Sequence, residues 1–324
     1  MRFRNIRGSA ILIGLFILIM DSKTAAQGAA QGLTICLQTV VPSLFPFIFL
    51  SVLLNDSYVG RPLSILRPLG TVCNIPQGAE SLLISSFLGG YPVGAQSVSE
   101  AYKKGSLSRS EAERMLSFCN NAGPAFLFGM IASFFSKFWM IVALWCIQIM
   151  SAVLVSKIMM RSNNAAVSLS KQSAFSVSDA LRLSLRCIAV ICGWVILFRV
   201  IIAFSDKWFL WICSAEIRTI ILGILDLTNG SLALPEIADE GLRFVICSGV
   251  LSFGGLCITM QTRSVCPGLS LRYYYIGKAI QTVFSILLSL AAVHRNIWLF
   301  GVIFLLTAAL KVKNKDSIPS PIVV

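Results

Sequence analysis

Charged residues and histidine are scarce in this sequence of 324 residues. Asp, Glu, Lys and Arg together make up 13% of the chain, and there is one histidine. A soluble domain carries roughly 25% charged residues. Hydrophobic residues make up 56% here, and the mean hydropathy is +0.81. A soluble globule cannot hide so much apolar surface, so the composition excludes an ordinary soluble enzyme and a disordered protein. It predicts an all-α, polytopic membrane protein.

Motifs of catalysis, metal binding and nucleotide binding are missing as well. The ten cysteines lie mostly inside apolar runs and form no C-x-x-C pair, and His294 stands alone. A zinc site or a disulfide framework is therefore not expected. The sequence also lacks GxxxxGK, a GxGxxG after a strand, and G-x-S-x-G, which weighs against an ATP-driven pump and a serine hydrolase. We expect no enzyme, no metal and no cofactor.

The net charge of +13 comes from clusters of Lys and Arg between the apolar runs. The clusters are Arg2, Arg4 and Arg7; Lys103, Lys104, Arg109 and Arg114; Lys157, Arg161 and Lys171; Arg263, Arg272 and Lys278; and Lys311, Lys313 and Lys315. This pattern follows the positive-inside rule and suits anionic lipid headgroups. The expected partner of these charges is therefore the lipid bilayer and not a nucleic acid, and the charges are expected to lie outside the spans.

The order of apolar and polar segments divides the chain into two membrane halves. We expect an N-terminal half over residues 1–160, a polar linker at 161–178, a C-terminal half at 179–310 and a basic tail at 311–324. Residues 8–21 form either an uncleaved first span or the apolar part of a signal peptide that ends near Ala26. Both alternatives start on the cytoplasmic side.

Proline and glycine interrupt several of the expected spans. Residues 33–54 carry Pro42 and Pro46, which predict a kinked or broken helix. Residues 89–94 read GGYPVG, which cannot hold a straight helix, so a re-entrant hairpin or a discontinuous helix is expected there. The span expected at 115–135 contains an Asn-Asn-x-Gly-Pro break, and the one at 208–227 runs into Thr-Asn-Gly.

The two halves carry similar interruptions in a different order. Each has a Gly-Gly pair, at Gly89 and Gly254, and an Asn-Gly break, at Asn121 and Asn229. The segment at 242–261 is ambiguous between a hairpin and a full span. Paired interrupted segments in two halves are typical of a transporter core. The alternative is that these small residues only let helices pack closely.

A broken helix in a membrane survives only inside protein or against a wet cavity, because unpaired backbone groups are costly in lipid. Its half-helix N-termini can hold an anionic solute. We therefore expect a neutral, amide-rich centre that binds a small, anionic solute. The candidate binding residues are Gln77, Glu80, Ser85, Gly89, Gly90, Tyr91, Asn120, Asn121, Gly123, Thr228, Asn229, Gly254 and Gln261. Glu80 and Asp226 are either capping residues or, if buried, proton carriers.

The broken segments resemble the YlbJ-type sporulation integral membrane proteins. The matching motifs are AQGL at 30–33, VPSLFPF at 41–47, GGYPVGA at 89–95, SFCNNAGP at 117–124, DLTNG at 226–230 and SFGGL at 252–256. They occur in order over roughly residues 25–295, and their combination is specific. The family is similar in turn to the nucleoside-recognition, or Gate-domain, membrane proteins and to concentrative nucleoside carriers.

This resemblance implies a fold and a role. It implies two inverted repeats, each with a helical hairpin and a broken helix that meet at the midplane, and a Gate-like repeat at 61–160. It further implies the outer forespore membrane, with movement of dipicolinic acid toward the forespore. Gln77 and Glu80 fall near the positions where the carriers have a Gln and a Glu. Cys257 to Met260 depart from the pattern, because a polar residue is expected before Gln261.

The function predicted from these observations is transport or facilitated passage of a small anionic solute, with dipicolinic acid as the candidate. The alternative is a non-transporting membrane protein that assembles with other sporulation components. Expected partners are the solute, the bilayer, and either a second copy of the chain or other sporulation membrane proteins.

Overall fold

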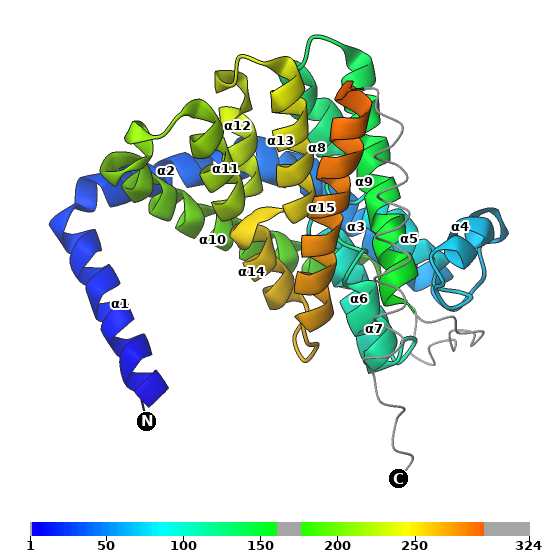
Figure 1. The fold of residues 1–324 in the computed structure, drawn as a ribbon. Coiled ribbons are helices and arrows are strands. Elements are labelled where there is room, and N and C mark those ends of the chain that lie inside the picture. The colour runs from blue at the N-terminus through cyan, green and yellow to red at the C-terminus, as the bar shows by residue number, and fades with distance from the viewer. Residues whose placement is uncertain (1, 161–175, 295–324) are drawn as a thin grey trace.

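The protein is a bundle of α-helices in a computed structural model that describes residues 2–160 and 176–294 (Figure 1). No strand occurs among these residues, which confirms the all-α class. Within them, five helical stretches are long and apolar enough to cross a membrane: Ser22–Tyr58, Phe138–Met159, Val177–Trp208, Glu240–Val265 and Arg272–His294. The predicted span at 297–310, the tail and most of the polar linker lie outside the described residues.

The α-helices are α1 (Arg2–Met20), α2 (Ser22–Ile35), α3 (Val41–Tyr58), α4 (Arg67–Val72), α5 (Glu80–Phe87), α6 (Val93–Lys103), α7 (Arg109–Met115), α8 (Pro124–Gly129), α9 (Phe138–Met159), α10 (Val177–Trp208), α11 (Ala215–Leu225), α12 (Leu227–Ala233), α13 (Glu240–Phe253), α14 (Gly255–Val265) and α15 (Arg272–His294). Short helical turns are η1 (Cys36–Val40), η2 (Ser64–Leu66), η3 (Ile131–Phe134), η4 (Leu210–Ile212) and η5 (Leu234–Glu236).

The first long helix stays continuous through its prolines. A π-turn, η1, joins α2 to α3, and the Val41 N–H donates to the Cys36 carbonyl. Pro42 follows at the start of α3 and Pro46 lies inside it. A proline removes one N–H and displaces a carbonyl on the preceding turn, and a π-turn is one way to absorb that displacement. The sequence correctly located the irregularity, but the chain does not break there.

Close packing joins this helix to α10. A Cβ on Gly28 would lie 2.9 Å from the Val200 Cα, and one on Gly32 would lie 2.8 Å from the Ile196 Cα. Glycines four residues apart let two backbones approach in this way within a membrane. The long pair α2–α3 and α10 therefore forms one layer, which crosses the upright helices α9, α13 and α15 (Figure 1).

Each half contains a helical hairpin followed by a broken helix. In the first half α5 packs against α6, and residues 116–123 separate α7 from α8 without regular helix. In the second half α11 packs against α12 around Asp226, and α13 continues into α14 through Gly254 and Gly255, both at positive φ. The second hairpin is thus α11–α12, and the Gly-Gly pair at 254 interrupts a spanning helix. The spans expected at 115–135 and 208–227 are accordingly divided.

Glycine lets hairpin and broken helix cross by backbone contact in both halves. A Cβ on Gly94 in α6 would lie 1.8 Å from the Cys119 carbonyl oxygen. A Cβ on Gly255, at the break before α14, would lie 2.9 Å from the Gly223 carbonyl oxygen in α11. No side chain fits at such distances, so these crossings fix where the helix ends meet.

Basic residues of the described chain gather toward one end of the bundle. Lys104 follows α6, Arg109 begins α7 and Arg272 begins α15, and these elements lie toward the lower end in Figure 1, as does the start of α1. Acidic Glu236 and Asp239 lie near the start of α13, at the opposite end. By the positive-inside rule, the lower end is expected to face the cytoplasm. Lys278 departs from this pattern: it is 3% exposed, inside α15.

Candidate binding site

A cavity lies where the two hairpins and two broken helices meet. Residues 89–91 at the tip of the first hairpin, Gly123 before α8, Asp226 between α11 and α12, and Gln261 of α14 all line it, and α3 closes one side. Its volume open to water molecules is about 60 Å³, which is enough for a few ordered waters. Segments far apart in the sequence thus share one small chamber.

A wider space, which we call the vestibule, adjoins the chamber on one side. Thr39, Ser43, Phe126 and Thr228 line both spaces, and the vestibule offers about 620 Å³ by the same measure. Its outer walls are α8, η3 and the end of α12, so it lies toward the end of the molecule where α9 begins. By the charge distribution this is the non-cytoplasmic end.

Several helix N-termini point their partial positive charge at the chamber. Tyr91 lies just before α6, Gly123 caps α8, and Asp226 caps α12. The first N–H groups of a helix have no partner within the helix and favour negative charge. These ends meet because the chain breaks at all three places.

Gln261 presents an amide that is not fully paired. The side chain is 1% exposed, its Nε2 reaches only the Cys257 sulfur at 3.3 Å, and its Oε1 has no partner. A buried polar atom without a partner costs roughly 1–3 kcal/mol. Because Gln261 lines the chamber, a bound polar molecule would remove that cost.

Lys278 places a buried amine directly behind the chamber wall. Its Nζ donates to the Tyr91 hydroxyl at 2.8 Å, the Gln281 Oε1 at 2.8 Å and the Ser252 carbonyl at 3.2 Å. It also lies 4.8 Å from the centre of the Tyr91 ring. These partners carry no negative charge, and Tyr91 stands between the ammonium and the chamber. The prediction that the basic residues lie outside the spans is wrong for Lys278, which is buried inside the span Arg272–His294.

A hydrogen-bond network anchors Lys278 in the bundle. Gln281 donates to the Asn121 Oδ1 at 2.7 Å, and Gln148 of α9 donates to the Ser252 hydroxyl at 2.6 Å. Asn121 in turn donates to the Ser86 hydroxyl at 3.2 Å and the Phe118 carbonyl at 2.7 Å. The network ties α9, α13 and α15 to the broken segment before α8, which fixes the position of Tyr91.

Asp226 supplies a carboxylate on the opposite wall. It is 2% exposed, and its Oδ2 accepts from the Asn229 backbone N–H at 2.9 Å and from the Asn229 side chain at 2.8 Å. The residue therefore caps α12 and also lines the chamber. The structure confirms Asp226 as a capping residue and shows that it is buried, and a role as proton carrier stays a prediction.

The predicted binding residues fall into three groups: those that line the chamber, those behind its wall and those away from it. Those that line the chamber are Gly89, Gly90, Tyr91, Gly123, Thr228 and Gln261. Three others lie just behind its wall: Gly254 packs against the Tyr91 ring, Asn121 binds Gln281, and Asn229 binds Asp226. Asn120 donates to Thr262 at 2.9 Å and does not line the chamber.

The remaining predicted residues do not line the chamber. Gln77 is exposed on the loop before α5. Glu80 is fully buried, but it pairs with Arg67 at 3.0 Å and accepts from the Gly78 N–H at 2.8 Å. Ser85 accepts from Asn55 at 2.8 Å. The structure therefore gives Glu80 a role in holding the first hairpin to α4.

Lys278, Gln281 and Gln148 are the residues that the sequence reasoning missed. Lys278 was grouped with the basic clusters outside the spans, although it lies inside the apolar run 271–293. A charge within such a run is rare and marks function or a buried partner. That signal, together with a glutamine one turn later, was present in the sequence.

Comparison with known proteins gives one informative match. No family model and no solved structure matches the chain. The sequence is 22% identical to the sporulation integral membrane protein YlbJ of Bacillus subtilis (strain 168), with 86% of this chain and 81% of that protein covered. The protein is a multi-pass integral membrane protein. Its similarity to YlbJ covers both hairpins, and the link to Gate-domain proteins stays a prediction.

Proposed function

We propose that this protein transports, or facilitates the passage of, a small anionic solute that binds in the chamber during sporulation. The observation that carries this proposal is the incompletely paired amide of Gln261, whose Nε2 meets only a sulfur, in a chamber with Lys278 behind its wall. A buried amide in this state calls for an explanation, and a polar molecule bound in the chamber supplies one.

The electrostatics of the chamber favour an anion on the side of the first hairpin. The Tyr91 hydroxyl accepts from the Lys278 ammonium and donates to the Leu251 carbonyl at 3.0 Å. Helix starts at α6 and α8 face the same space. A charge acts more strongly there than in water because the local dielectric constant is low.

Dipicolinic acid is the first solute to test. It is a small planar dicarboxylate, so amide and backbone N–H groups can bind both of its ends. The chamber alone is too small for it, and the adjoining vestibule provides the remaining room. The similarity to a sporulation protein supports this choice, and the outer forespore membrane is the location that we propose with it.

The two halves support an inverted-repeat transporter. Hairpin α5–α6 enters from the end of the molecule where Lys104 lies. Hairpin α11–α12 follows the C-terminal end of α10. Both tips reach the same chamber, as in transporters whose binding site lies between two repeats. We propose that the halves are pseudo-symmetric on this basis.

Solute flux in reconstituted vesicles tests the proposal. Gln261→Leu should lower dipicolinate flux about 10- to 100-fold, the loss expected for one hydrogen bond to a charged group. Lys278→Met should lower it comparably. Gln77→Leu is the matched control, because Gln77 is exposed and lies away from the chamber. Equal flux in all variants, or no flux in the unaltered protein, would contradict the proposal.

An apolar groove favours the second candidate, a membrane protein that assembles with a partner. Ile224 of α11, Val250 and Phe253 of α13, and Ile286 of α15 line it, with about 400 Å³ of space for water-sized molecules. Such a groove suits another transmembrane helix, from a second copy or another sporulation membrane protein. Cross-linking from Ile224→Cys in sporulating cells, without any solute flux, would support this candidate over transport.

A further inference from the structure

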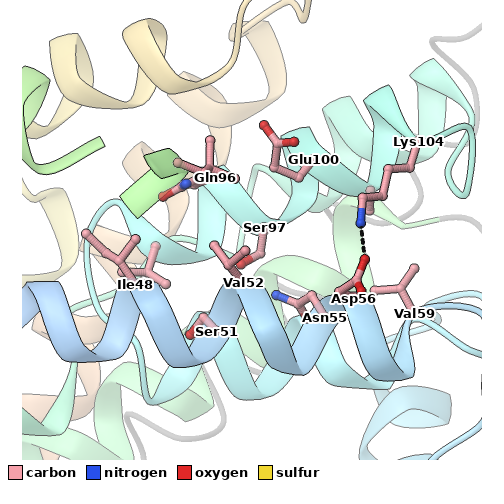
Figure 2. Close-up of a pocket in the computed structure, with 13 residues that line it drawn as sticks. Ile48, Ser51, Val52, Asn55, Asp56, Val59, Gln96, Ser97, Glu100 and Lys104 are labelled. Carbon is pink, nitrogen blue, oxygen red and sulfur yellow. Dashed lines mark hydrogen bonds and ion pairs between the residues drawn. The ribbon is translucent and has the colours of Figure 1, made fainter. Parts of the chain in front are cut away.

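A second polar cavity lies on the seam between α3 and α6, on the cytoplasmic side of the chamber. Ser51 and Asn55 of α3 face Gln96, Ser97 and Glu100 of α6 across it (Figure 2). It has about 30 Å³ of space for the centres of water-sized molecules. We refer to it as the seam cavity.

Gln96 is the feature that requires an explanation. Its side chain is 4% exposed, and neither its Nε2 nor its Oε1 has a partner. Asn55 adds a second unpartnered atom, its Oδ1, while its Nδ2 donates to Ser85 at 2.8 Å. A buried amide with neither atom paired is costly, and Figure 2 shows Gln96 on the wall of this cavity. The wall is therefore built for a polar occupant.

The mouth of the seam cavity is charged. Lys104 donates to Asp56 across it (Figure 2), and Glu100 pairs with Lys103 at 2.7 Å. These residues lie at the C-terminal end of α6, where the basic clusters mark the cytoplasmic side. The cavity therefore faces the opposite aqueous phase from the vestibule.

A short apolar barrier separates the seam cavity from the chamber. Along α3, Leu44 lines the chamber and Ile48, one turn later, lines the seam cavity. Along the hairpin, Tyr91 lines the chamber and Val93 the seam cavity. Ile48 is 0% exposed and Val93 is 1% exposed. Apolar constrictions of this kind close a polar route by excluding water.

We propose that the seam cavity is a second binding position for the same small carboxylate solute, and that Ile48 and Val93 form the closed gate between the two positions. The proposal rests on the proposed function and adds the path of the solute. The solute passes from the vestibule to the chamber, through the gate to the seam cavity, and from there to the cytoplasm. The amide of Gln96 donates to a solute carboxylate there, and Lys104 balances its charge at the mouth. The cavity admits the solute once α6 separates from α3.

Cysteine accessibility tests the gate without any need for transport. The background replaces Cys146, Cys192 and Cys213, the thiols outside the buried set, by serine. Ser97→Cys is expected to react with a membrane-impermeant thiol reagent only from the cytoplasmic side, and Ser43→Cys only from the other side. Ser99→Cys, on the same helix but outside the cavity, should stay unlabelled.

Opening the barrier should change this pattern. With Ile48→Ala, Ser43→Cys becomes reactive from the cytoplasmic side as well, by about tenfold or more, because a shortened side chain no longer seals the route. Two results would contradict the gate. In the first, Ser43→Cys reacts from both sides although Ile48 is unchanged. In the second, Ser43→Cys still reacts from one side alone when Ile48→Ala is present. This result is independent of whether any solute crosses, so it separates failure of the gate from failure of the proposed function.

A second variant tests the binding position itself. Gln96→Leu removes an amide that makes no contact, so the folded protein should melt at the same or a higher temperature. Dipicolinate flux should nevertheless fall about tenfold, while binding in the chamber, measured as a solute-dependent rise in melting temperature, is retained. Lower stability with unchanged flux would show that Gln96 is only structural and would overturn the second position.

Discussion

The two hairpins reach the same chamber but place different groups there. The tip of α5–α6 carries Tyr91, whose hydroxyl accepts from the buried Lys278. The tip of α11–α12 is Asp226, a carboxylate that caps its own second helix. The first tip is thus positioned by Lys278 of α15. The second tip is positioned by hydrogen bonds within its own hairpin.

This difference indicates how the chamber distinguishes solutes. The wall formed by the first hairpin offers helix N-termini and the Tyr91 hydroxyl to a solute carboxylate, while the wall formed by the second offers a carboxylate that disfavours it. Variants of the two tips should then differ in the sign of their effect.

The largest effect is expected at the closest backbone contacts of the two hairpins: α6 against the broken segment before α8, and α12 against α11. Gly94→Ala places a Cβ 1.8 Å from the Cys119 carbonyl, and Gly230→Ala places one 2.3 Å from the Gly223 Cα. Overpacking against backbone costs about 3 kcal/mol or more, so both variants should lower yield and melting temperature in detergent. Gly193→Ala is the control, since nothing lies within 4 Å of its Cβ. Equal melting of Gly94→Ala and Gly193→Ala would show that the crossing is looser than described.

An intermediate effect is expected at the first tip. Tyr91→Phe keeps the ring and removes the hydroxyl that joins Lys278 to the Leu251 carbonyl. The ammonium then loses one of its partners, and affinity for dipicolinate should fall about tenfold, the cost of one hydrogen bond to a charged group. Isothermal titration or solute-dependent melting measures this. Tyr275→Phe, at an exposed tyrosine, should leave affinity unchanged, and an equal loss there would contradict the specific role of Tyr91.

The class of the fold and the places of the breaks could be predicted from the sequence, whereas the partners across the bundle could not. Gly89 and Gly254 mark real interruptions because glycine is a poor residue for a helix interior. The break expected at Asn229 lies instead at Asp226, and Asn229 and Gly230 are inside α12. Their pairing is set by tertiary packing: the Gly-Gly pairs do not form equivalent elements, since the second hairpin turns at Asp226.

Some residues of the candidate site could be predicted from the sequence because they lie next to a break in a helix, and others could not. Tyr91, Gly123 and Gln261 line the chamber because they adjoin breaks, and breaks are visible in a sequence. Glu80 and Ser85 also adjoin a break, yet they bind Arg67 and Asn55. Lys278 lies in an unbroken helix, far along the chain from Tyr91, so proximity to a break could not identify it.

The smallest change in stability, and the one that best separates the two tips, is expected for Asp226→Asn. Asparagine also caps helices, so the Asn229 N–H keeps an acceptor and the cost in stability should stay below about 1 kcal/mol. The carboxylate charge is lost, so affinity for dipicolinate should rise, opposite in sign to Tyr91→Phe. Isothermal titration with dipicolinate measures this change. An affinity that stays the same or falls in Asp226→Asn would show that Asp226 only caps α12 and that the two tips do not differ in how they act on an anion.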